Sequence, residues 1–541
     1  VIKAAEDAGI ESDGLDLYRI RLLHYREFSK ENLDKALEAV IELRKRVQLR
    51  TEDDPTDIDN PQDVDRELAL IYWDMDKNEE ALSILNKCLE SNPDNTSIAN
   101  LKVDILNRSG RSDEALEICK SLYMKDMNAY NGTRLGVCYE RLEQFDEAIN
   151  HYKAAYNKDP RYHVVVRRLM YLYSYLSDRR KDLELCKEAI RYATEYIELT
   201  NSAEGYVERG NLYIDLYELE KAVDDCRKAI ELNPEAYYAY NNLGCALLKL
   251  RRTEEAIPPL LHAIELDESK DHLPYLNLAE AYTVLGRYNE AIKEYKRLLE
   301  VFPGHTYVWK DIVKLYLRIG EYDKAIDYYE KEISERRKEL DKVSFTDRLK
   351  DHTAGLGIEE KLMELYYDLG DAYRQAGKKV QANECYEKVE KRYNSITKPK
   401  LSTKLAFKLM ELYRDSGELE KAKKLIVKLK NGIEYYDYEA VKQYYFISTT
   451  VYFELGDVKK AVKAGDDFAK KIGERFGSVM DDYLKDKRYK PSRLYELVIV
   501  DICTGALAEA KKRVEQIREC KLCVMCESPD CFEYHFAKGL I

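Results

Sequence analysis

The sequence predicts an all-α protein built as a solenoid, in which antiparallel helix pairs stack one after another along the chain. First, similar segments recur at intervals of 34 or 35 residues. Second, the 541 residues include only 12 prolines and 23 glycines, so few residues interrupt helices. Third, many of the 45 tyrosines recur at equivalent places in these segments. A chain of this length exceeds what one compact core serves, whereas a repeat array can extend indefinitely.

Three consecutive segments show the repeat, and the third of them reads YLNLAEAYTVLGRYNEAIKEYKRLLEVFP from Tyr275. Each has an aromatic residue, then a small residue, then an alanine and an aliphatic run that ends near Pro or Asp. The small residues are Gly210, Gly244 and Ala279, and the alanines are Ala222, Ala256 and Ala291. Small side chains at these places allow two helices to approach closely. The interval fits one helix pair, whose apolar stripes are buried only by stacking against neighbouring pairs.

Other copies are marked by further alanines: Ala36, Ala81, Ala115, Ala148, Ala189, Ala325, Ala382, Ala422, Ala461 and Ala510. They give about twelve to thirteen repeats. The repeated tyrosines are expected to fill the space between neighbouring units, with the hydroxyl reaching solvent or a carbonyl. Stretches such as RSDEA and RYNEA are expected to supply a side-chain cap to the second helix of each pair.

In these residues the chain resembles the tetratricopeptide repeat family over nearly its whole length. The resemblance implies that the pairs form a right-handed superhelix (an α-α superhelix) whose concave wall is lined by the first helices. It also implies a scaffold, because that wall commonly binds extended peptides in this family. We expect no enzyme, because the sequence contains no G-x-S-x-G, phosphate-loop, H-E-x-x-H or G-x-G-x-x-G signature.

Departures from the regular interval predict the domain organisation. We expect an N-terminal array over residues 1–340 with an acidic loop insertion near 50–65. The interval between Ala325 and Ala382 is 57 residues, which indicates a long second helix through about Leu340 and a connector or hinge at 341–358. A C-terminal array over 359–541 ends in an incomplete repeat. The chain begins VIKAAEDAGI without an initiator Met, so we expect a piece of a longer protein.

Asparagines are candidate partner-binding residues. By the family geometry, Asn211, Asn242 and Asn277 fall on or near the inward face of three consecutive first helices. One amide both donates and accepts, so asparagine matches a peptide unit without reading its sequence. The family's clamp for chaperone carboxy-termini needs basic residues where this chain has Val207, Leu273 and Asn277, so that activity is not expected. Alternatively, these asparagines only reflect the repeat consensus.

A cationic group is the second candidate. Lys310, Lys314 and Arg318 recur every four residues on one first helix, and Lys249 lies two units earlier on the same wall. Like charges at this spacing repel one another, a cost that a bound anion offsets. Because the chain as a whole carries a net charge of −13, a basic groove would select acidic or carboxylate-bearing segments. The alternative is an ordinary solvated face.

The stretch CKLCVMCESPDCFEYH places Cys520, Cys523, Cys526 and Cys531 in a turn between repeats at 520–531. Four thiolates can hold one structural zinc tetrahedrally and staple two repeats. The spacing also partly matches iron–sulfur ligation, and without metal the thiols would pack or form a disulfide. The remaining cysteines fall within predicted helices as buried thiols of a reducing compartment, so we expect a cytoplasmic protein: Cys88, Cys119, Cys138, Cys186, Cys226, Cys245, Cys385 and Cys503.

The favoured function is therefore a scaffold that binds extended or acidic peptide segments in the concave groove. Two alternatives stay open: a regulatory or substrate-presenting repeat region of a larger enzyme or signalling protein, and a zinc- or thiol-dependent switch at the C-terminal turn. The negative net charge disfavours binding to nucleic acid and to anionic membranes. The sequence contains no run of 18 apolar residues, so we expect no membrane span. We expect no cofactor other than one structural zinc. The partner's identity and the oligomeric state are not encoded in any recognisable pattern.

Overall fold

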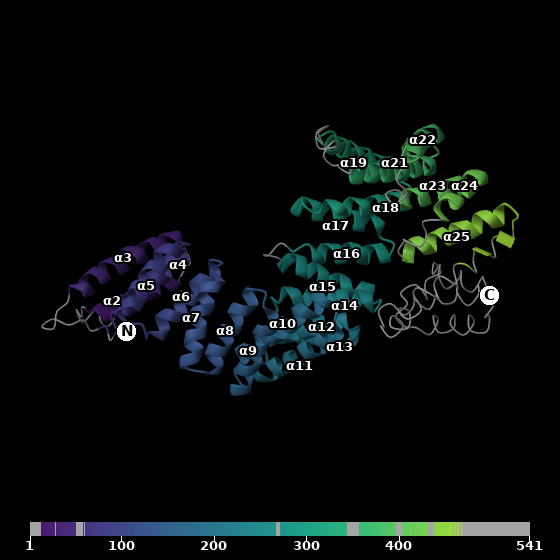
Figure 1. Cartoon of the computed structure of the whole chain (residues 1–541). Coiled ribbons are helices and arrows are strands. Elements are labelled where there is room, and N and C mark those ends of the chain that lie inside the picture. The colour runs from purple at the N-terminus through teal and green to yellow at the C-terminus, as the bar shows by residue number, and fades with distance from the viewer. Residues whose placement is uncertain are drawn as a thin grey trace. The chain divides into compact units, whose positions relative to one another are not determined.

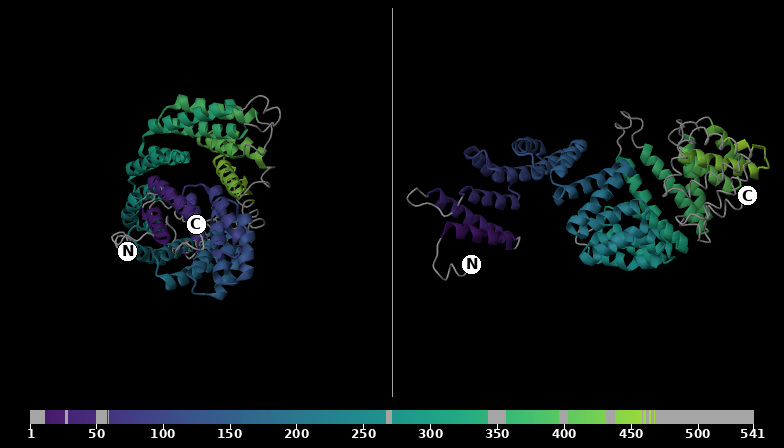
Figure 2. Two further views of the ribbon diagram at one scale, coloured as in Figure 1. Left: turned by 90° about the vertical axis from the view of Figure 1, so that its left-hand side faces the viewer. Right: turned by 90° about the horizontal axis from the view of Figure 1, so that it is seen from below.

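The computed structural model describes residues 12–26, 29–49, 58, 60–266, 271–342, 356–395, 403–430 and 438–457, and a few positions between 459 and 467. Throughout these ranges the regular structure is helical and contains no strand, which confirms the predicted all-α solenoid class. The chain divides into two compact units, Val1–Leu212 and Tyr213–Ile541. Figures 1 and 2 show that within each unit consecutive helices lie side by side.

In the first unit each helix from α2 to α10 packs against the next one along the chain, and α12 contains the boundary at residues 212 and 213. The helices are α2 (Asp13–Arg26), α3 (Lys30–Gln48), α4 (Gln62–Asp74), α5 (Asn78–Ser91), α6 (Thr96–Arg108), α7 (Ser112–Lys125), α8 (Ala129–Arg141), α9 (Phe145–Lys158), α10 (His163–Arg180), α11 (Leu183–Thr200) and α12 (Ala203–Asp215).

The second unit continues the same pattern of successive helix packing. Its helices are α13 (Leu219–Leu232), α14 (Tyr237–Lys249), α15 (Thr253–Leu266), α16 (Leu273–Val284), α17 (Tyr288–Val301), the short 3₁₀ helix η1 (Thr306–Val308), α18 (Trp309–Ile319), α19 (Tyr322–Lys342), α21 (Leu356–Gln375), α22 (Lys379–Ser395), α23 (Thr403–Asp415), α24 (Leu419–Lys430) and α25 (Tyr438–Glu454).

The predicted small residues lie in the core. Every repeat-marking alanine in the described part of the chain, from Ala36 to Ala422, is at most 2% exposed. Gly244 of α14 faces Leu260 of α15, and a Cβ at residue 244 would come within 2.4 Å of the Leu260 side chain. The glycine therefore makes room for a side chain of the paired helix. The packing of this side chain explains why the residue must be small.

The turn inside a helix pair closes through backbone hydrogen bonds. In the pair α14–α15, Arg251 has a positive φ of 63°, and the amide of Arg252 donates to the carbonyl of Leu247 at 2.9 Å. This is the Schellman arrangement, which satisfies free carbonyls at the end of the first helix. Some of these turns use glycine, whereas others use larger residues: Asp76, Glu143, Tyr217 and Arg251.

The predicted side-chain caps of the second helices are wrong for RSDEA and RYNEA. The residues that precede α7 and α17 are Arg111 and Arg287, and neither makes a side-chain capping bond. Ser112 instead lies inside the first turn of α7. Each arginine pairs with the glutamate three residues later, at 2.6 Å for Arg111 and 2.8 Å for Arg287. Side-chain capping is found at other helix starts, as where Asn128 before α8 accepts from the amide of Asn131 at 2.8 Å.

Buried tyrosines do fill the space between helices, but the structure corrects the partner of the hydroxyl. The ring of Tyr152 is fully buried and its hydroxyl donates to Glu140. Tyr386 donates to Asp371 at 2.7 Å in the same manner. Tyr444 meets the expected carbonyl, that of Ile426. A carboxylate partner keeps the hydroxyl hydrogen-bonded while the ring packs in the core.

A buried histidine joins the first helices of the first two pairs, α2 and α4. His24 of α2 is fully buried, and its two ring nitrogens lie 2.8 Å from Glu67 and 2.8 Å from Asp74, both on α4. Burial alone would lower the pKa of His24, but the hydrogen bonds to these carboxylates outweigh it and raise the pKa above the ordinary value. The two contacts with Glu67 and Asp74 therefore hold α2 against α4.

The helices on either side of the predicted connector pack against each other. Most of 341–358 and most of the acidic insertion near 50–65 lie outside the described residues. Helix α19 ends at Lys342, which confirms the long second helix expected through about Leu340. It packs against α21, and Lys378 just beyond α21 pairs with Asp323 at 2.6 Å. The division into arrays at 1–340 and 359–541 stays a prediction.

Candidate interaction surface

The predicted asparagines are partly used within the protein. Asn277 of α16 donates from Nδ2 to Oδ1 of Asn241 on α14 at 3.0 Å, and Asn241 in turn lies 3.5 Å from Oδ1 of Asn242. Asn241 is 5% exposed, whereas Asn242 and Asn277 are half-buried. A short amide ladder thus joins two successive first helices. Among the described residues, Nδ2 of Asn242 and Oδ1 of Asn277 have no hydrogen-bond partner.

Asn211 belongs to a different unit from the other two asparagines. It is half-buried on α12 and belongs to the first unit, whereas Asn242 and Asn277 belong to the second. The amide ladder contains Asn241 instead, a residue that the sequence analysis did not single out. Its only signal was its place directly before Asn242.

The three predicted cations, Lys310, Lys314 and Arg318, form an exposed row on α18, here called the cationic stripe. The helix turns its apolar residues into the core: Ile312, Val313, Leu315 and Tyr316. The four-residue spacing places the cations on the opposite side. Lys314 pairs with Asp311 on its own helix at 2.9 Å.

The other two cations of the stripe lie near aromatic rings. Nζ of Lys310 lies 5.8 Å from the Trp309 ring, and the guanidinium of Arg318 lies 5.7 Å from the Tyr288 ring. Neither has a carboxylate partner among the described residues. Lys249 on α14 is similar, because its Nζ lies 5.5 Å from the Tyr217 ring and pairs with no described carboxylate. Such contacts hold a cation in place and leave its hydrogen-bond donors available to a ligand.

An apolar row, which the sequence analysis missed, lies at the starts of α14 and α16 and in η1, which directly precedes α18. The side chains of Tyr238, Leu273 and Tyr307 are 57%, 44% and 52% exposed. Each lies six residues before the residue that occupies the small-residue place of its repeat. Tyr307 is steadied by His305, whose Nδ1 lies 3.2 Å from the tyrosine hydroxyl. The sequence analysis explains the many tyrosines mainly by core packing. It therefore does not identify the shared position of these three residues in their repeats.

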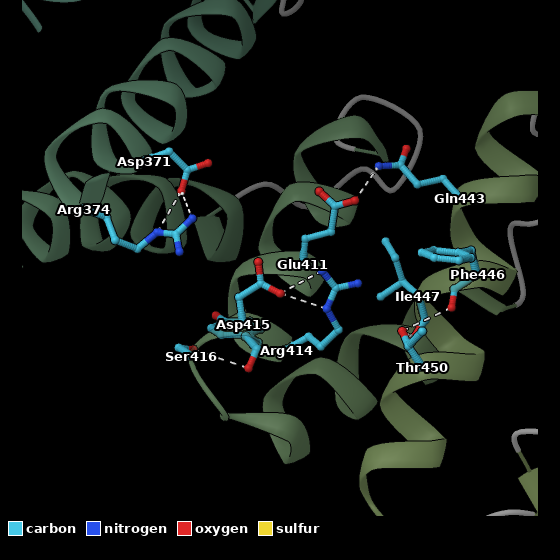
Figure 3. A network of polar contacts seen from close by, with 11 residues as sticks. Asp371, Arg374, Glu411, Arg414, Asp415, Ser416, Gln443, Phe446, Ile447 and Thr450 are labelled. Atoms are coloured by element: carbon cyan, nitrogen blue, oxygen red, sulfur yellow. Dashed lines mark hydrogen bonds and ion pairs between the residues drawn. The ribbon is translucent and has the colours of Figure 1, made fainter. Parts of the chain in front are cut away.

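A contrasting set of polar residues lies on α21, α23 and α25 (Figure 3). Arg374 pairs with Asp371 at 3.1 Å, and Arg414 pairs with Asp415 at 2.7 Å. Gln443 of α25 donates to Glu411 of α23 at 3.2 Å. We call this group the paired face, because both of its arginines are matched with carboxylates.

A depression of about 680 Å³ lies between α13, α14 and α15. It is open to solvent, and the rings of Tyr240 and His262 meet in it with centroids 4.5 Å apart. The other lining residues are Arg227, Ile230, Glu231, Leu243, Pro258 and Pro259. Within the ranges that the structure describes, no three His, Cys, Asp or Glu side chains come together in a way that suits a metal ion.

The predicted zinc ligands Cys520, Cys523, Cys526 and Cys531 lie outside the described residues, so the zinc site stays a prediction. Seven of the other eight cysteines are described, and all seven are free thiols. Six of these are buried, as expected for packing residues, and Cys245 is half-buried.

Comparison with known families agrees with the repeat geometry. A model of the Psidin N-terminal TPR repeat region matches residues 65–185. Tetratricopeptide repeat models match residues 203–236, 226–257, 272–334 and 364–393. The fold defines a helical-repeat solenoid. With these matches, the chain belongs to the tetratricopeptide repeat family.

Among curated proteins, the chain is similar to tetratricopeptide repeat-containing protein trd-1 of Caenorhabditis elegans, with 28% identity over 42% of this chain and 27% of that protein. It is also similar to the BBSome complex member BBS4 of Bos taurus, with 28% identity over 20% of each chain. The chain thus spans about a quarter of the length of these relatives or less.

Among solved structures, the C-terminal part of a TPR repeat-containing protein from Cytophaga hutchinsonii is 20% identical, with a TM-score of 0.35 over 45% of this chain and 97% of that one.

Tetratricopeptide repeats in general form scaffolds for protein–protein interaction and are generally not catalytic, and no enzyme family is indicated for this chain. Of the helices that the structure describes, none is both long enough and apolar enough to cross a membrane.

Proposed function

We propose that this protein is a scaffold that binds an extended acidic peptide segment along α14, α16 and α18. The cationic stripe would pair with acidic side chains of the segment. The observation that carries the proposal is that Lys310 and Arg318 are exposed without a carboxylate partner among the described residues. In a chain of net charge −13, unpaired cations on one helix favour an acidic ligand and repel a basic one.

The amide ladder would supply the contacts to the peptide backbone. Nδ2 of Asn242 can donate to a peptide carbonyl, and Oδ1 of Asn277 can accept from a peptide amide. Because Asn277 is held by Asn241, its orientation is set before the ligand arrives, which reduces the entropy lost on binding. These contacts read backbone, so the acidic selectivity comes from the stripe. Lys249 remains in the proposal as a further contact for a longer segment, and Asn211, on the first unit, stays a separate candidate contact.

The names of two relatives support a role in assembly. BBS4 is described as a member of the BBSome complex, and a human relative with 25% identity over 29% of this chain is named superkiller complex protein 3. Both names place those proteins in multiprotein complexes. A scaffold role for this chain is consistent with them.

The test compares the full chain with the variant K310E/K314E/R318E. The probe is a fluorescently labelled short peptide with aspartate at alternate positions, and fluorescence anisotropy measures its affinity. We expect the triple charge reversal to weaken binding at least about tenfold, because each reversed charge replaces an attraction of up to ~1 kcal/mol by a repulsion.

The matched control is K424E/K428E/K430E on α24, which makes the same change of charge on a second helix. We expect the control to bind within a factor of two of the unchanged chain. Equal losses in both variants would mean that only net charge matters, and no loss in the stripe variant would remove the proposal.

A separate proposal concerns the cysteines of the C-terminal stretch. We propose that Cys520, Cys523, Cys526 and Cys531 bind one structural zinc. The support is the sequence pattern of four thiols within twelve residues. Elemental analysis of protein expressed in zinc-replete medium is expected to give close to one zinc per chain. The variant C523S/C526S should lose the metal, whereas C88S should keep it, and zinc-free unchanged protein would contradict the proposal.

A further inference from the structure

Two buried cysteines face each other between α7 and α8. Sγ of Cys119 on α7 lies 3.4 Å from Sγ of Cys138 on α8, within hydrogen-bond distance. Cys119 is 1% exposed and Cys138 is fully buried. Helices α7 and α8 belong to successive pairs, α6–α7 and α8–α9, so the two thiols lie across the contact between neighbouring repeats.

We propose that Cys119 and Cys138 are a site of oxidative modification, at which a hydroperoxide converts the two thiols into a disulfide that joins successive repeats. The distance between the sulfur atoms carries this inference. A disulfide requires them to approach to about 2.05 Å, and side-chain rotation with a small movement of α7 against α8 covers the difference.

The surroundings assign different roles to the two sulfur atoms. Nδ2 of Asn107 on α6 lies 3.6 Å from Sγ of Cys138 and donates to it. The hydrogen bond with Cys119 and this amide both lower the pKa of Cys138, although burial opposes the effect. The same hydrogen bond raises the pKa of Cys119. Cys138 is therefore the sulfur that ionises first, and the thiolate is the nucleophile toward a peroxide.

The reaction balances in two steps. Sγ of Cys138 attacks one peroxide oxygen, the O–O bond breaks, and the other oxygen takes up the thiol proton and leaves, as water from hydrogen peroxide or as an alcohol from an organic hydroperoxide. This gives a sulfenic acid at Cys138. Sγ of Cys119 then attacks Sγ of Cys138, the S–O bond breaks, and water leaves with the Cys119 proton. One hydroperoxide molecule is reduced, and the two thiols are oxidised to one disulfide.

The burial of the pair determines when the reaction occurs. Because neither sulfur is accessible in the closed structure, the oxidant reaches Cys138 only when α7 and α8 separate transiently. Once formed, the bond would oppose that separation. In a repeat array, stability is approximately the sum of repeat and neighbour-contact contributions, so one covalent link strengthens this contact in particular.

The experiment treats the full chain with hydrogen peroxide, blocks the remaining thiols with iodoacetamide and maps tryptic peptides by mass spectrometry. We expect a linked peptide pair that contains Cys119 and Cys138 and disappears on reduction with dithiothreitol. The oxidised chain should melt several degrees higher than the reduced chain. The variants C119S and C138S should give no such pair and no rise in Tm, whereas C88S, which removes another buried thiol, should behave as the unchanged chain.

Recovery of Cys119 and Cys138 as separate alkylated, sulfinic or otherwise paired residues after complete treatment would overturn the inference. Should C138S fold poorly, C138A serves the same purpose, and the peptide map of the unchanged chain is decisive without either variant. The acidic peptide assay is independent, because the thiol pair lies in the first unit and the cationic stripe lies in the second.

Discussion

The cationic stripe and the paired face show two ways to place charge on the same kind of scaffold. Both lie on first helices of the second unit. On α18, Lys310 and Arg318 contact aromatic rings but no described carboxylate. On α21 and α23, Arg374 and Arg414 are matched with Asp371 and Asp415. The number of cations is therefore a poor guide to anion binding, because the pairing of each cation decides its availability.

The energetic reason is competition. An acidic ligand that approaches Arg374 must replace the contact with Asp371 and also face the charge of that carboxylate. Exposed ion pairs are weak, typically about 0.2–1 kcal/mol, but the remaining carboxylate repels the ligand as well. A ligand that approaches Arg318 meets neither obstacle. The two faces thus differ in selectivity although they share one helical framework.

The largest expected effect tests that shared framework. A Cβ at residue 244 would lie 2.4 Å from Leu260, and one at residue 370 would lie 2.6 Å from Tyr386. We expect Gly244→Ala and Gly370→Ala each to lower the free energy of unfolding by about 1–3 kcal/mol through overpacking. Urea denaturation measures the change. Gly304→Ala is the control, since nothing lies within 4 Å of a Cβ at that residue. If either of the first two variants were as stable as the unchanged chain, the helix pairs of the two regions would not depend on the same glycine packing.

The apolar row gives the next effect. Replacing Tyr238, Leu273 and Tyr307 with serine is expected to weaken a peptide that alternates aspartate with leucine about tenfold, which corresponds to roughly 1.4 kcal/mol. Affinity for an aspartate peptide without leucine should change little. Because these side chains are already exposed, Tm should stay nearly constant. An equal loss of affinity for both peptides would mean that the row does not recognise the leucine side chains.

The third effect converts one face into the other. In the K310E/K314E/R318E background, the further changes D371N and D415N remove the carboxylates that match Arg374 and Arg414. We expect affinity for the aspartate peptide to rise a few-fold by anisotropy. The control E384Q/E387Q neutralises two exposed acids of α22 and should give a smaller gain. If both pairs of changes act alike, local pairing does not govern ligand access.

The smallest expected effect concerns the buried contacts of His24 with Glu67 and Asp74, which are tested by changing the pH. The carboxylates of Glu67 and Asp74 raise the pKa of His24 in the folded chain, so the stability that they contribute is fully present below the unfolded pKa of about 6.5. It is lost as pH rises through the folded pKa. We expect the free energy of unfolding of the first unit to fall over this range, as measured by chemical denaturation at several pH values. H24Q should flatten the dependence, and an unchanged slope would exclude His24 as its source.

The sequence contains enough to predict the framework. The intervals between alanines locate the helix pairs. Each pair requires a small side chain where its helices meet, so a small residue recurs once in every repeat. The exposure of the cationic stripe follows from the same logic, since cations four residues apart opposite apolar residues must face outward.

Pairing between residues that are far apart in the chain produces no such sequence pattern. The stripe and the paired face look alike in composition, and the difference depends on neighbours such as Gln443, which reaches Glu411 on another helix. Asn277 finds Asn241 rather than Asn242 for the same reason, because one residue of rotation along α14 decides which amide it meets. The capping error at Ser112 arose because a capping residue and a first-turn residue have similar composition, and only the path of the preceding turn separates them.

The turn that joins the helices of a pair has a consequence for how such arrays diversify. A left-handed residue other than glycine costs about 1–2 kcal/mol in the fold, but glycine there costs about 0.5–1 kcal/mol in chain entropy. The two costs differ by only about 1 kcal/mol, so this place accepts some residues other than glycine, as Asp76, Glu143, Tyr217 and Arg251 show. Tyr217 uses that freedom: its ring lies 5.5 Å from Lys249 while its backbone still completes the turn. The positive-φ residue in the turn of each helix pair is thus a position where a substitution can change ligand binding with little effect on the fold.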